Sequence, residues 1–274
     1  MAQTATQHGG KVHISVKNLV KTYGDVKAVQ DVTFDVAAGS IFAFLGPNGA
    51  GKTTTIKMLT TLVKPTSGAI EVNGADPTKH ANQARHSFGI VFQDPSLDDE
   101  LSAYENMFLH AGLYGVPRSE TPTKIKDLLE FVELWERKDS LVKTFSGGMK
   151  RRLEIARGLL HTPAILFLDE PTVGLDPQTR NHIWSYLKKL NEERGLTIFF
   201  TTHYMDEVER TATRVAIIDH GKLIADDSVQ GILNKAGSET LEDAFIKLTG
   251  HAIRSEQAAA VDQFRNVARA WGRR

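Results

Sequence analysis

The segment that decides the fold is Gly46-Pro47-Asn48-Gly49-Ala50-Gly51-Lys52-Thr53-Thr54. It follows a short apolar run, residues 41–45, of the kind buried at the centre of a sheet, and it opens a stretch with helical spacing. Glycines allow the backbone to curl so that successive N–H groups face inward, and the start of a helix adds partial positive charge. The segment therefore predicts a phosphate-binding loop of the pattern GxxxxGK followed by Ser or Thr.

Each residue type in this loop has a task in binding a nucleoside triphosphate. Lys52 is expected to reach the β- and γ-phosphates, and the Thr53 hydroxyl is expected to ligate Mg²⁺. The alternative is a glycine-rich turn that happens to precede a lysine. A strand before the loop and a helix after it are the context that a phosphate-binding loop requires, and both are predicted here.

A second motif places two carboxylates at the end of another buried strand. The apolar residues 165–168 are followed by Asp169 and Glu170, and open α/β sheets bind ligands at the carboxyl ends of their strands. We expect Asp169 to hold Mg²⁺ through a water molecule and Glu170 to be the general base that polarises the attacking water. Many strands end in acids, so this motif gains its weight from the phosphate-binding loop.

Strands alternate with helices along the chain, which predicts an α/β fold with a largely parallel sheet covered on both faces. The predicted strands are 12–19, 26–36, 41–45, 69–72, 87–92, 165–168, 196–200, 215–218 and 222–225. The predicted helices are 53–62, most of 102–134 with a break at 115–117, 149–160, 177–193 and 240–248.

The composition excludes several classes of protein. Among the 274 residues, Lys+Arg and Asp+Glu are both 33, and this neutral balance argues against a nucleic-acid partner. The chain has no cysteine, which excludes a disulfide framework and a thiolate site. No stretch approaches the roughly 20 apolar residues that span a bilayer, and the first ten residues lack the apolar core of a secretory signal. We therefore expect a cytoplasmic protein that reaches a membrane only through a partner.

A third motif, Ser146-Gly147-Gly148, is a second candidate anion site at the start of a helix. One ATP does not need two distant phosphate cradles in one domain. Two head-to-tail copies would explain the pair, because each cradle would then cap the γ-phosphate held by the other copy's loop. The alternative is an ordinary helix N-cap formed by Ser146.

With these motifs in this order, the sequence resembles the ABC-transporter ATPase family over about residues 12–250. The family's signature is LSGGQ, and this chain has Phe145-Ser146-Gly147-Gly148-Met149. Met149 lacks the polar group of Gln. Within this signature, the resemblance therefore implies ATP contacts for Ser146, Gly147 and Gly148 but not for Met149. The implied fold is a P-loop NTPase with a RecA-like, mostly parallel core, an antiparallel β subdomain and a helical subdomain inserted at about 94–160. The ATPase domain would span residues 11–250.

The resemblance implies roles for four further residues. Tyr23 would stack on adenine, and Gln93 would sense Mg²⁺ and the attacking water. Asp176 would touch the active site of the other copy, and His203 would contact the γ-phosphate. Each has a structural alternative, namely core packing for Tyr23, a plain strand end for Gln93, a helix N-cap for Asp176 and a structural histidine for His203.

The implied function is that of the ATP-binding and ATP-hydrolysing subunit of an ABC transporter, peripheral on the cytoplasmic face of the membrane. Its expected partners are a second copy or a paralogue in an ATP-sandwich dimer and a separate membrane permease. We hypothesise that a short permease helix binds the apolar residues Leu97, Leu101, Tyr104 and Phe108, although they could equally form an ordinary helix core. Segments 91–97, 145–149 and 241–250 look most like the branch that exports drugs, lipids and polymers, which includes the daunorubicin-resistance type.

The two ends of the chain carry separate predictions. Residues 1–10 are expected to form a disordered tail. In residues 251–274 the apolar side chains Ala258, Val261, Phe264, Ala268 and Trp271 fall on one helical stripe, and the segment after Asp262 is basic. This pattern predicts a basic amphipathic helix that lies on an anionic membrane or on a partner, or that docks on its own domain.

Other functions share some of these motifs. A soluble ABC-type ATPase without a permease would keep every motif. A small-molecule kinase would use the same phosphate-binding loop but would leave Ser146 and His203 without a task. A pure binding module would have no use for Glu170 beside a Mg²⁺-binding carboxylate.

Overall fold

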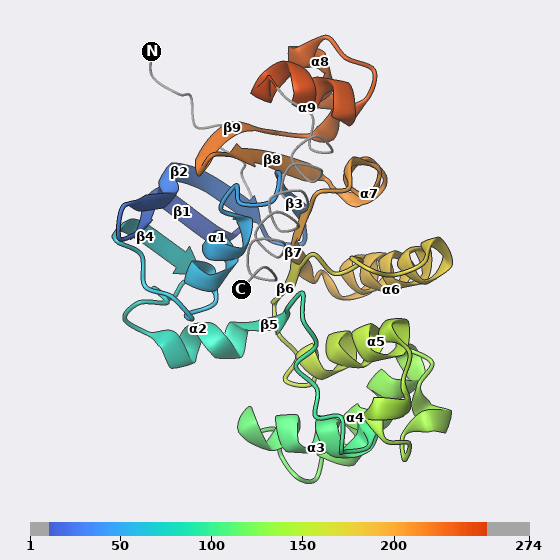
Figure 1. Ribbon diagram of the computed structural model, residues 1–274. Helices are drawn as coiled ribbons and strands as arrows, with labels where there is room; N and C mark the ends of the chain where they lie inside the picture. Colours follow the sequence, from blue (N-terminus) through green and yellow to red (C-terminus); the bar gives the residue numbers. More distant parts are fainter. Residues whose placement is uncertain (1–10, 251–274) are drawn as a thin grey trace, which may run out of the picture.

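The computed structural model describes residues 11–250, which form two sheets and the helices around them (Figure 1). A six-stranded sheet has the order β5-β6-β7-β3-β8-β9, and a three-stranded antiparallel sheet has the order β2-β1-β4. The strands are β1 Val12–Tyr23, β2 Val26–Ala37, β3 Ile41–Leu45, β4 Ser67–Val72, β5 Phe88–Val91, β6 Ile165–Asp169, β7 Thr197–Thr202, β8 Arg214–Asp219 and β9 Lys222–Asp227. Within the six-stranded sheet only β9 pairs in the antiparallel direction. The predicted α/β fold with an antiparallel β subdomain is confirmed.

The helices agree with the prediction in the longer segments and differ in the shorter ones. They are α1 Lys52–Leu59, α2 Ala81–Ser87, α3 Ala103–Leu113, α4 Thr121–Phe131, α5 Gly147–Gly158, α6 Pro177–Arg194, α7 Met205–Thr211, α8 Val229–Ala236 and α9 Leu241–Thr249, with 3₁₀ turns at Trp135–Arg137 and Val142–Thr144. The expected extension of α1 to residue 62 is wrong, because Thr61 adopts a left-handed φ of 68°. The short helices α2, α7 and α8 were not predicted.

None of the helices in residues 11–250 is both long and apolar enough to cross a membrane. The predictions for residues 1–10 and 251–274 lie outside the described residues.

Strand β3 is buried on both faces, and its alternate side chains enter different cores. Phe42 and Phe44 pack with α1 and with the three-stranded sheet, and Phe34 of β2 stacks on Phe42 with ring centroids 5.5 Å apart. Ala43 and Leu45 face the other core, which includes residues of α3 to α7. Because parallel strands in such a position have no solvent face, the continuous apolar run of β3 is what this location requires.

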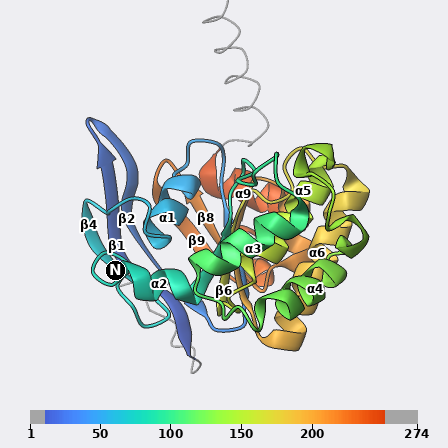
Figure 2. The same cartoon turned by 90° about the horizontal axis from the view of Figure 1, so that it is seen from below.

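Helices α3, α4 and α5 form a block at one end of the molecule in Figure 1, and α4 and α5 lie apart from α1 and the three-stranded sheet in both views (Figures 1 and 2). The block joins the six-stranded sheet where the chain leaves β5 and where it enters β6. At this junction α5 comes very close to β5, because a Cβ atom on Gly89 would overlap with the carbonyl group of Gly158. The block therefore rests on the sheet through direct contact between the two main chains.

The close approach of β5 and α5 gives a test of this packing. Gly89→Ala should lower the free energy of unfolding by about 1–3 kcal/mol, because either β5 or α5 must shift to admit the methyl group. Chemical denaturation followed by circular dichroism measures this change. Gly112→Ala on α3 is the matched control, since a Cβ there meets no atom within 4 Å, and it should be neutral or slightly stabilising. Equal effects of the two substitutions would contradict the packing described here.

Candidate active site

The candidate site forms where β3, β6 and β7 end together. In the register of the sheet, Leu45 of β3 pairs with Thr202 of β7, and Asp169 of β6 pairs with Thr201. The loop after β3 and the acids at the end of β6 therefore flank the end of the strand that lies between them. This is the edge at which open α/β sheets bind ligands.

The loop between β3 and α1 is packed so tightly that Gly46 and Gly51 are required. A Cβ atom on Gly46 would overlap with the carbonyl oxygen of Ile218. Gly51 has a φ of +107°, and a Cβ atom there would lie 2.5 Å from the carbonyl oxygen of Ala28. The glycines of the pattern that predicted phosphate binding are thus also the residues that this loop needs in order to pack against β8 and β2.

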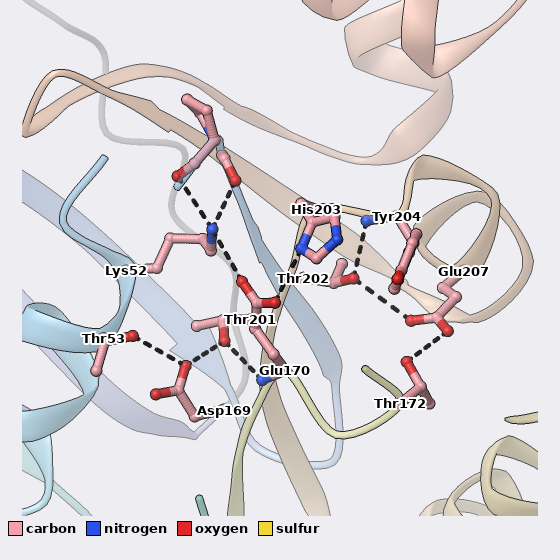
Figure 3. Close-up of polar contacts among 12 residues, drawn as sticks. Lys52, Thr53, Asp169, Glu170, Thr172, Thr201, Thr202, His203, Tyr204 and Glu207 are labelled. Carbon is pink, nitrogen blue, oxygen red and sulfur yellow. Dashed lines mark hydrogen bonds and ion pairs between the residues drawn. The ribbon is translucent and has the colours of Figure 1, made fainter. Parts of the chain in front are cut away.

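Lys52 has its ammonium at the centre of the site (Figure 3). Its Nζ donates hydrogen bonds to the carbonyl oxygens of Gly46, at 2.7 Å, and Pro47, at 3.1 Å. The same nitrogen lies 3.1 Å from Oε1 of Glu170. Burial lowers the pKa of Lys52, and the nearby charge of Glu170 opposes that effect. A positive charge beside a curled glycine loop is suited to binding a phosphate group.

Glu170 links the lysine to the predicted histidine. Nδ1 of His203 lies 2.8 Å from Oε2 of Glu170. Burial raises the pKa of Glu170, but the hydrogen bond to His203 and the charge of Lys52 outweigh burial and hold the pKa below its ordinary value. Glu170 also has a φ of 49°, a left-handed conformation that costs a non-glycine residue on the order of 1–3 kcal/mol. Such strain is typical of functional sites.

Asp169 lies beside two threonine hydroxyls. Thr201 Oγ1 donates a hydrogen bond of 2.6 Å to Oδ1 of Asp169, and Thr53 Oγ1 lies 3.4 Å from the same oxygen. The main-chain N–H of Glu170 donates to Thr201 Oγ1 at 3.0 Å. Thr201 therefore orients both acids, a role that the sequence analysis did not assign. No local pattern indicated this role, because it depends on the pairing of β6 with β7.

Glu207 is a second buried group that the sequence analysis missed. Its carboxylate accepts a hydrogen bond of 2.6 Å from Thr172, which follows the two acids, and another of 3.4 Å from Thr202. Burial raises the pKa of Glu207, although the bond from Thr172 partly offsets this rise. The Thr202 hydroxyl in turn accepts from the main-chain N–H of Tyr204 at 2.9 Å, so Glu207 supports the turn that carries His203.

Other predicted residues lie apart from the cluster around Lys52. Ser146 caps α5 by accepting from Met149 N at 3.3 Å, and Asp176 caps α6 by accepting from Thr179 N at 3.0 Å. Both residues are therefore helix N-caps, and their predicted contacts with ATP stay predictions. The two motifs are neighbours, because a Cβ atom on Gly148 would lie 2.5 Å from Cγ2 of Thr179. In Figures 1 and 2 the start of α5 is well separated from α1.

Tyr23 and Gln93 are both exposed. Tyr23, at the end of β1, is 46% exposed, so the alternative that it packs in the core is wrong. Gln93 follows β5, and its carbonyl oxygen accepts a hydrogen bond of 2.8 Å from Nη2 of Arg151. The strand β5 pairs with β6, so Gln93 leaves the sheet on the same side as the two acids.

Comparison with known proteins agrees with this geometry. The sequence profile of the family described as ABC transporter matches residues 29–173. The chain is 40% identical over 254 residues to the linearmycin resistance ATP-binding protein LnrL of Bacillus subtilis, covering 93% of this chain and 80% of that protein. It is 40% identical over 228 residues to the daunorubicin/doxorubicin resistance ATP-binding protein DrrA of Streptomyces peucetius, covering 83% and 69% respectively.

Solved structures lead to the same conclusion. An ATP-binding subunit of an ABC transporter aligns with a TM-score of 0.79 and 31% identity over 86% of this chain and 99% of that one. The ATP-binding cassette MJ0796, solved as a dimer in a post-hydrolysis state with ADP and Pi, aligns with a TM-score of 0.71 and 29% identity over 78% and 98%. The chain belongs to the ABC transporter family, and it is the ATPase component of such a transporter.

Thr201→Val tests whether the threonine orients the two acids. The substitution keeps the shape but removes the 2.6 Å hydrogen bond to Asp169, so the free energy of unfolding should fall by about 1–3 kcal/mol and the ATPase rate by about tenfold or more. Steady-state phosphate release measures the rate. Thr60→Val is the control, because the buried hydroxyl of this residue at the C-terminal end of α1 donates to Ile56 O at 2.8 Å, away from the two acids, and its ATPase rate should be unchanged. A Thr201→Val protein with full activity would refute the role.

Proposed function

We propose that two copies of the chain bind two ATP molecules between them and thereby drive an export permease. The observation that carries this proposal is the separation between the start of α5, with Ser146 and Gly148, and the cluster around Lys52. Within one copy these two candidate phosphate sites face different regions of the protein. In a head-to-tail pair, the Ser-Gly-Gly motif of each copy would cap the ATP held by the other. The dimeric structures of MJ0796 support such a pair.

The residues present suit a bound Mg²⁺ ion. Thr53 Oγ1 and Asp169 Oδ1 are oxygen donors 3.4 Å apart, and Gln93 is a third candidate at the end of β5. No group of three or more His, Cys, Asp or Glu residues within 11–250 could hold a metal ion alone. Mg²⁺ commonly binds one or two protein oxygens and completes its shell with phosphates and water. When bound, the ion would neutralise charge on the phosphates.

The residues of the site then have defined tasks. The loop 46–54 surrounds the phosphates, and Lys52 exchanges its carbonyl and carboxylate partners for phosphate oxygens. Glu170, released from Lys52, accepts a proton from the attacking water. His203 would then be free to contact the γ-phosphate, and Tyr23 would stack on adenine. Asp176 would meet the other copy near its active site.

ATP supplies mechanical work through differential affinity. A triphosphate held by Lys52 of one copy and Ser146 of the other binds the closed dimer much more tightly than the open one. Loss of the γ-phosphate removes the bridge between the copies and allows them to separate. The block of α3, α4 and α5, within the proposed helical subdomain at about 94–160, would carry the movement.

Export is favoured by the relatives that the chain resembles. Besides the two resistance proteins, the chain is 40% identical over 230 residues to a Nod factor export ATP-binding protein of Burkholderia lata, covering 84% of this chain and 75% of that protein. A separate permease would then hold the chain peripherally on the cytoplasmic face of the membrane. A soluble ABC-type ATPase without a permease is the competing function.

The surface of α3 is suited to receive a permease helix. Phe108 and Leu109 are 45% and 57% exposed, and Leu113 is 82% exposed. Tyr104 stacks on Phe108 with ring centroids 6.3 Å apart. Leu97 and Tyr104 pack partly against the core. Among the four apolar residues predicted to bind the permease helix, Phe108 is therefore the best candidate for direct contact.

The shared site is tested by ATP-dependent dimerisation of Glu170→Gln, measured by light scattering with and without Mg-ATP. The substitution keeps the shape of the side chain but removes the proposed base, so the dimer should form with ATP and persist while turnover is almost lost. Glu192→Gln, an exposed carboxylate on α6, should dimerise only transiently and hydrolyse ATP normally. A Glu170→Gln protein that binds ATP and stays monomeric would contradict the shared site.

The permease surface is tested by Phe108→Asp. A charge in an apolar contact is costly, so co-purification of the transporter's membrane subunit should fall by about tenfold or more while the ATPase fold stays intact. Ile246→Asp on α9, where the side chain is 37% exposed, is the matched control and should keep the complex. Equal recovery of the membrane subunit with both variants would exclude this surface.

A further inference from the structure

Arg151 on α5 holds the main chain that follows β5. Its Nη1 donates to the carbonyl oxygen of Phe92, and its Nη2 donates to that of Gln93 at 2.8 Å. A planar guanidinium with a fixed fork of donors can bind two consecutive carbonyls at once, which a lysine ammonium does not reproduce. The position of the Gln93 main chain is therefore tied to one side chain of α5.

Two more residues of α5 hold the same segment a few residues further on. Glu154 Oε1 accepts from Ser96 N at 2.8 Å, and Arg157 Nη1 donates to Ser96 O at 2.8 Å. Arg151, Glu154 and Arg157 are three residues apart and lie along one side of the helix. We refer to these three residues as the α5 clamp. In Figure 1 the chain passes alongside α5 on its way from β5 to α3.

The α5 clamp contains a buried ion pair, and a contribution to stability does not by itself account for burying these two charges. Arg151 and Glu154 are 5% and 1% exposed, and Arg151 Nη1 lies 3.1 Å from Glu154 Oε2. Burial lowers the pKa of Arg151 and raises that of Glu154, although their mutual attraction opposes both shifts. Buried ion pairs often contribute no more stability than apolar residues of similar size. What this pair does provide is a fixed geometry between α5 and the chain after β5.

The same helix begins at the predicted ATP-contacting motif. Ser146 caps α5, and Arg151 lies five residues later, about 7.5 Å along a helix axis. At the other end Gly158 is packed directly against Gly89 of β5. A rigid helix therefore connects Ser146 to the main chain of Gln93.

We propose that the α5 clamp carries information between the two ATP sites of the dimer. ATP of the other copy, bound at Ser146 and Gly148, would set the position of α5, and Arg151 would transmit that position to Gln93 in this copy's own site. Each copy would then hydrolyse ATP efficiently only when its α5 is engaged. This inference rests on the proposed shared-site dimer, with Arg151 as a positioning residue that acts through Gln93.

Arg151→Lys in the full-length protein is the test, with Arg152→Lys as the matched control. Arg152 donates to Val132 O at 2.9 Å, so it holds another part of the helical block by the same type of bond. For Arg151→Lys we expect kcat to fall about 10- to 100-fold, with KM for ATP changed by less than about threefold, because only the alignment of the reacting groups is affected. Arg152→Lys should retain kcat within about twofold. Glu154→Gln should act like Arg151→Lys, and it serves as the second variant if Arg151→Lys does not fold.

A double-mutant cycle separates positioning from a merely structural role. If Arg151 acts through Gln93, the Arg151→Lys, Gln93→Ala double variant should be no slower than Gln93→Ala alone. Independent, multiplicative losses would overturn the proposal, and so would an Arg151→Lys protein with unchanged kcat. ATP-dependent dimerisation is measured separately by light scattering, for Glu170→Gln alone and for the Glu170→Gln, Arg151→Lys double variant. If the double variant still forms a dimer, a negative kinetic result overturns only the proposed role of the α5 clamp. If Glu170→Gln alone forms no dimer, the shared site itself is refuted.

Discussion

The parallel pairing of β7 between β3 and β6 is the constraint on which the rest of the structure depends. It brings the phosphate-binding loop and the two acids together at the end of one strand. It also divides the two cores, because alternate residues of β3 face opposite sides of the sheet. A slip of one residue in this pairing would point the side chains of Phe42 and Phe44 to the opposite face of the sheet, and it would separate Asp169 from Thr201. Folding and catalysis are thus determined by the same register.

Much of the fold and of the central site could be predicted from the sequence. The continuous apolar runs of β3 and β6 are followed by motifs whose chemistry needs a strand end, so Lys52, Asp169 and Glu170 were placed correctly relative to the sheet. The short helices α2, α7 and α8 escaped prediction because one or two turns give too few apolar repeats to define a period. The roles of Thr201 and Glu207 depend on contacts between strands and turns far apart in the sequence, which no local pattern contains.

The charged side of α5 shows another limit of prediction from sequence. The sequence predicts a helix over residues 149–160 but indicates no role for Arg151, Glu154 or Arg157. In the structure this face is covered by the chain after β5, and the charges are satisfied by main-chain groups and by each other. Charged residues are rarely buried without such partners. Recognising a covered charged face requires knowledge of which segment lies over it.

The contacts of Lys52 have a consequence for which anions the site admits. Its ammonium already interacts with two carbonyl oxygens and the carboxylate of Glu170, so an incoming ligand must compete with an internal counterion rather than with water alone. The interaction of a small monovalent anion with Lys52 would not compensate for the loss of these contacts. A triphosphate brings several charged oxygens together and can also use the N–H groups of the loop. The internal partners of Lys52 thus favour ligands of high charge before the nucleotide base is recognised.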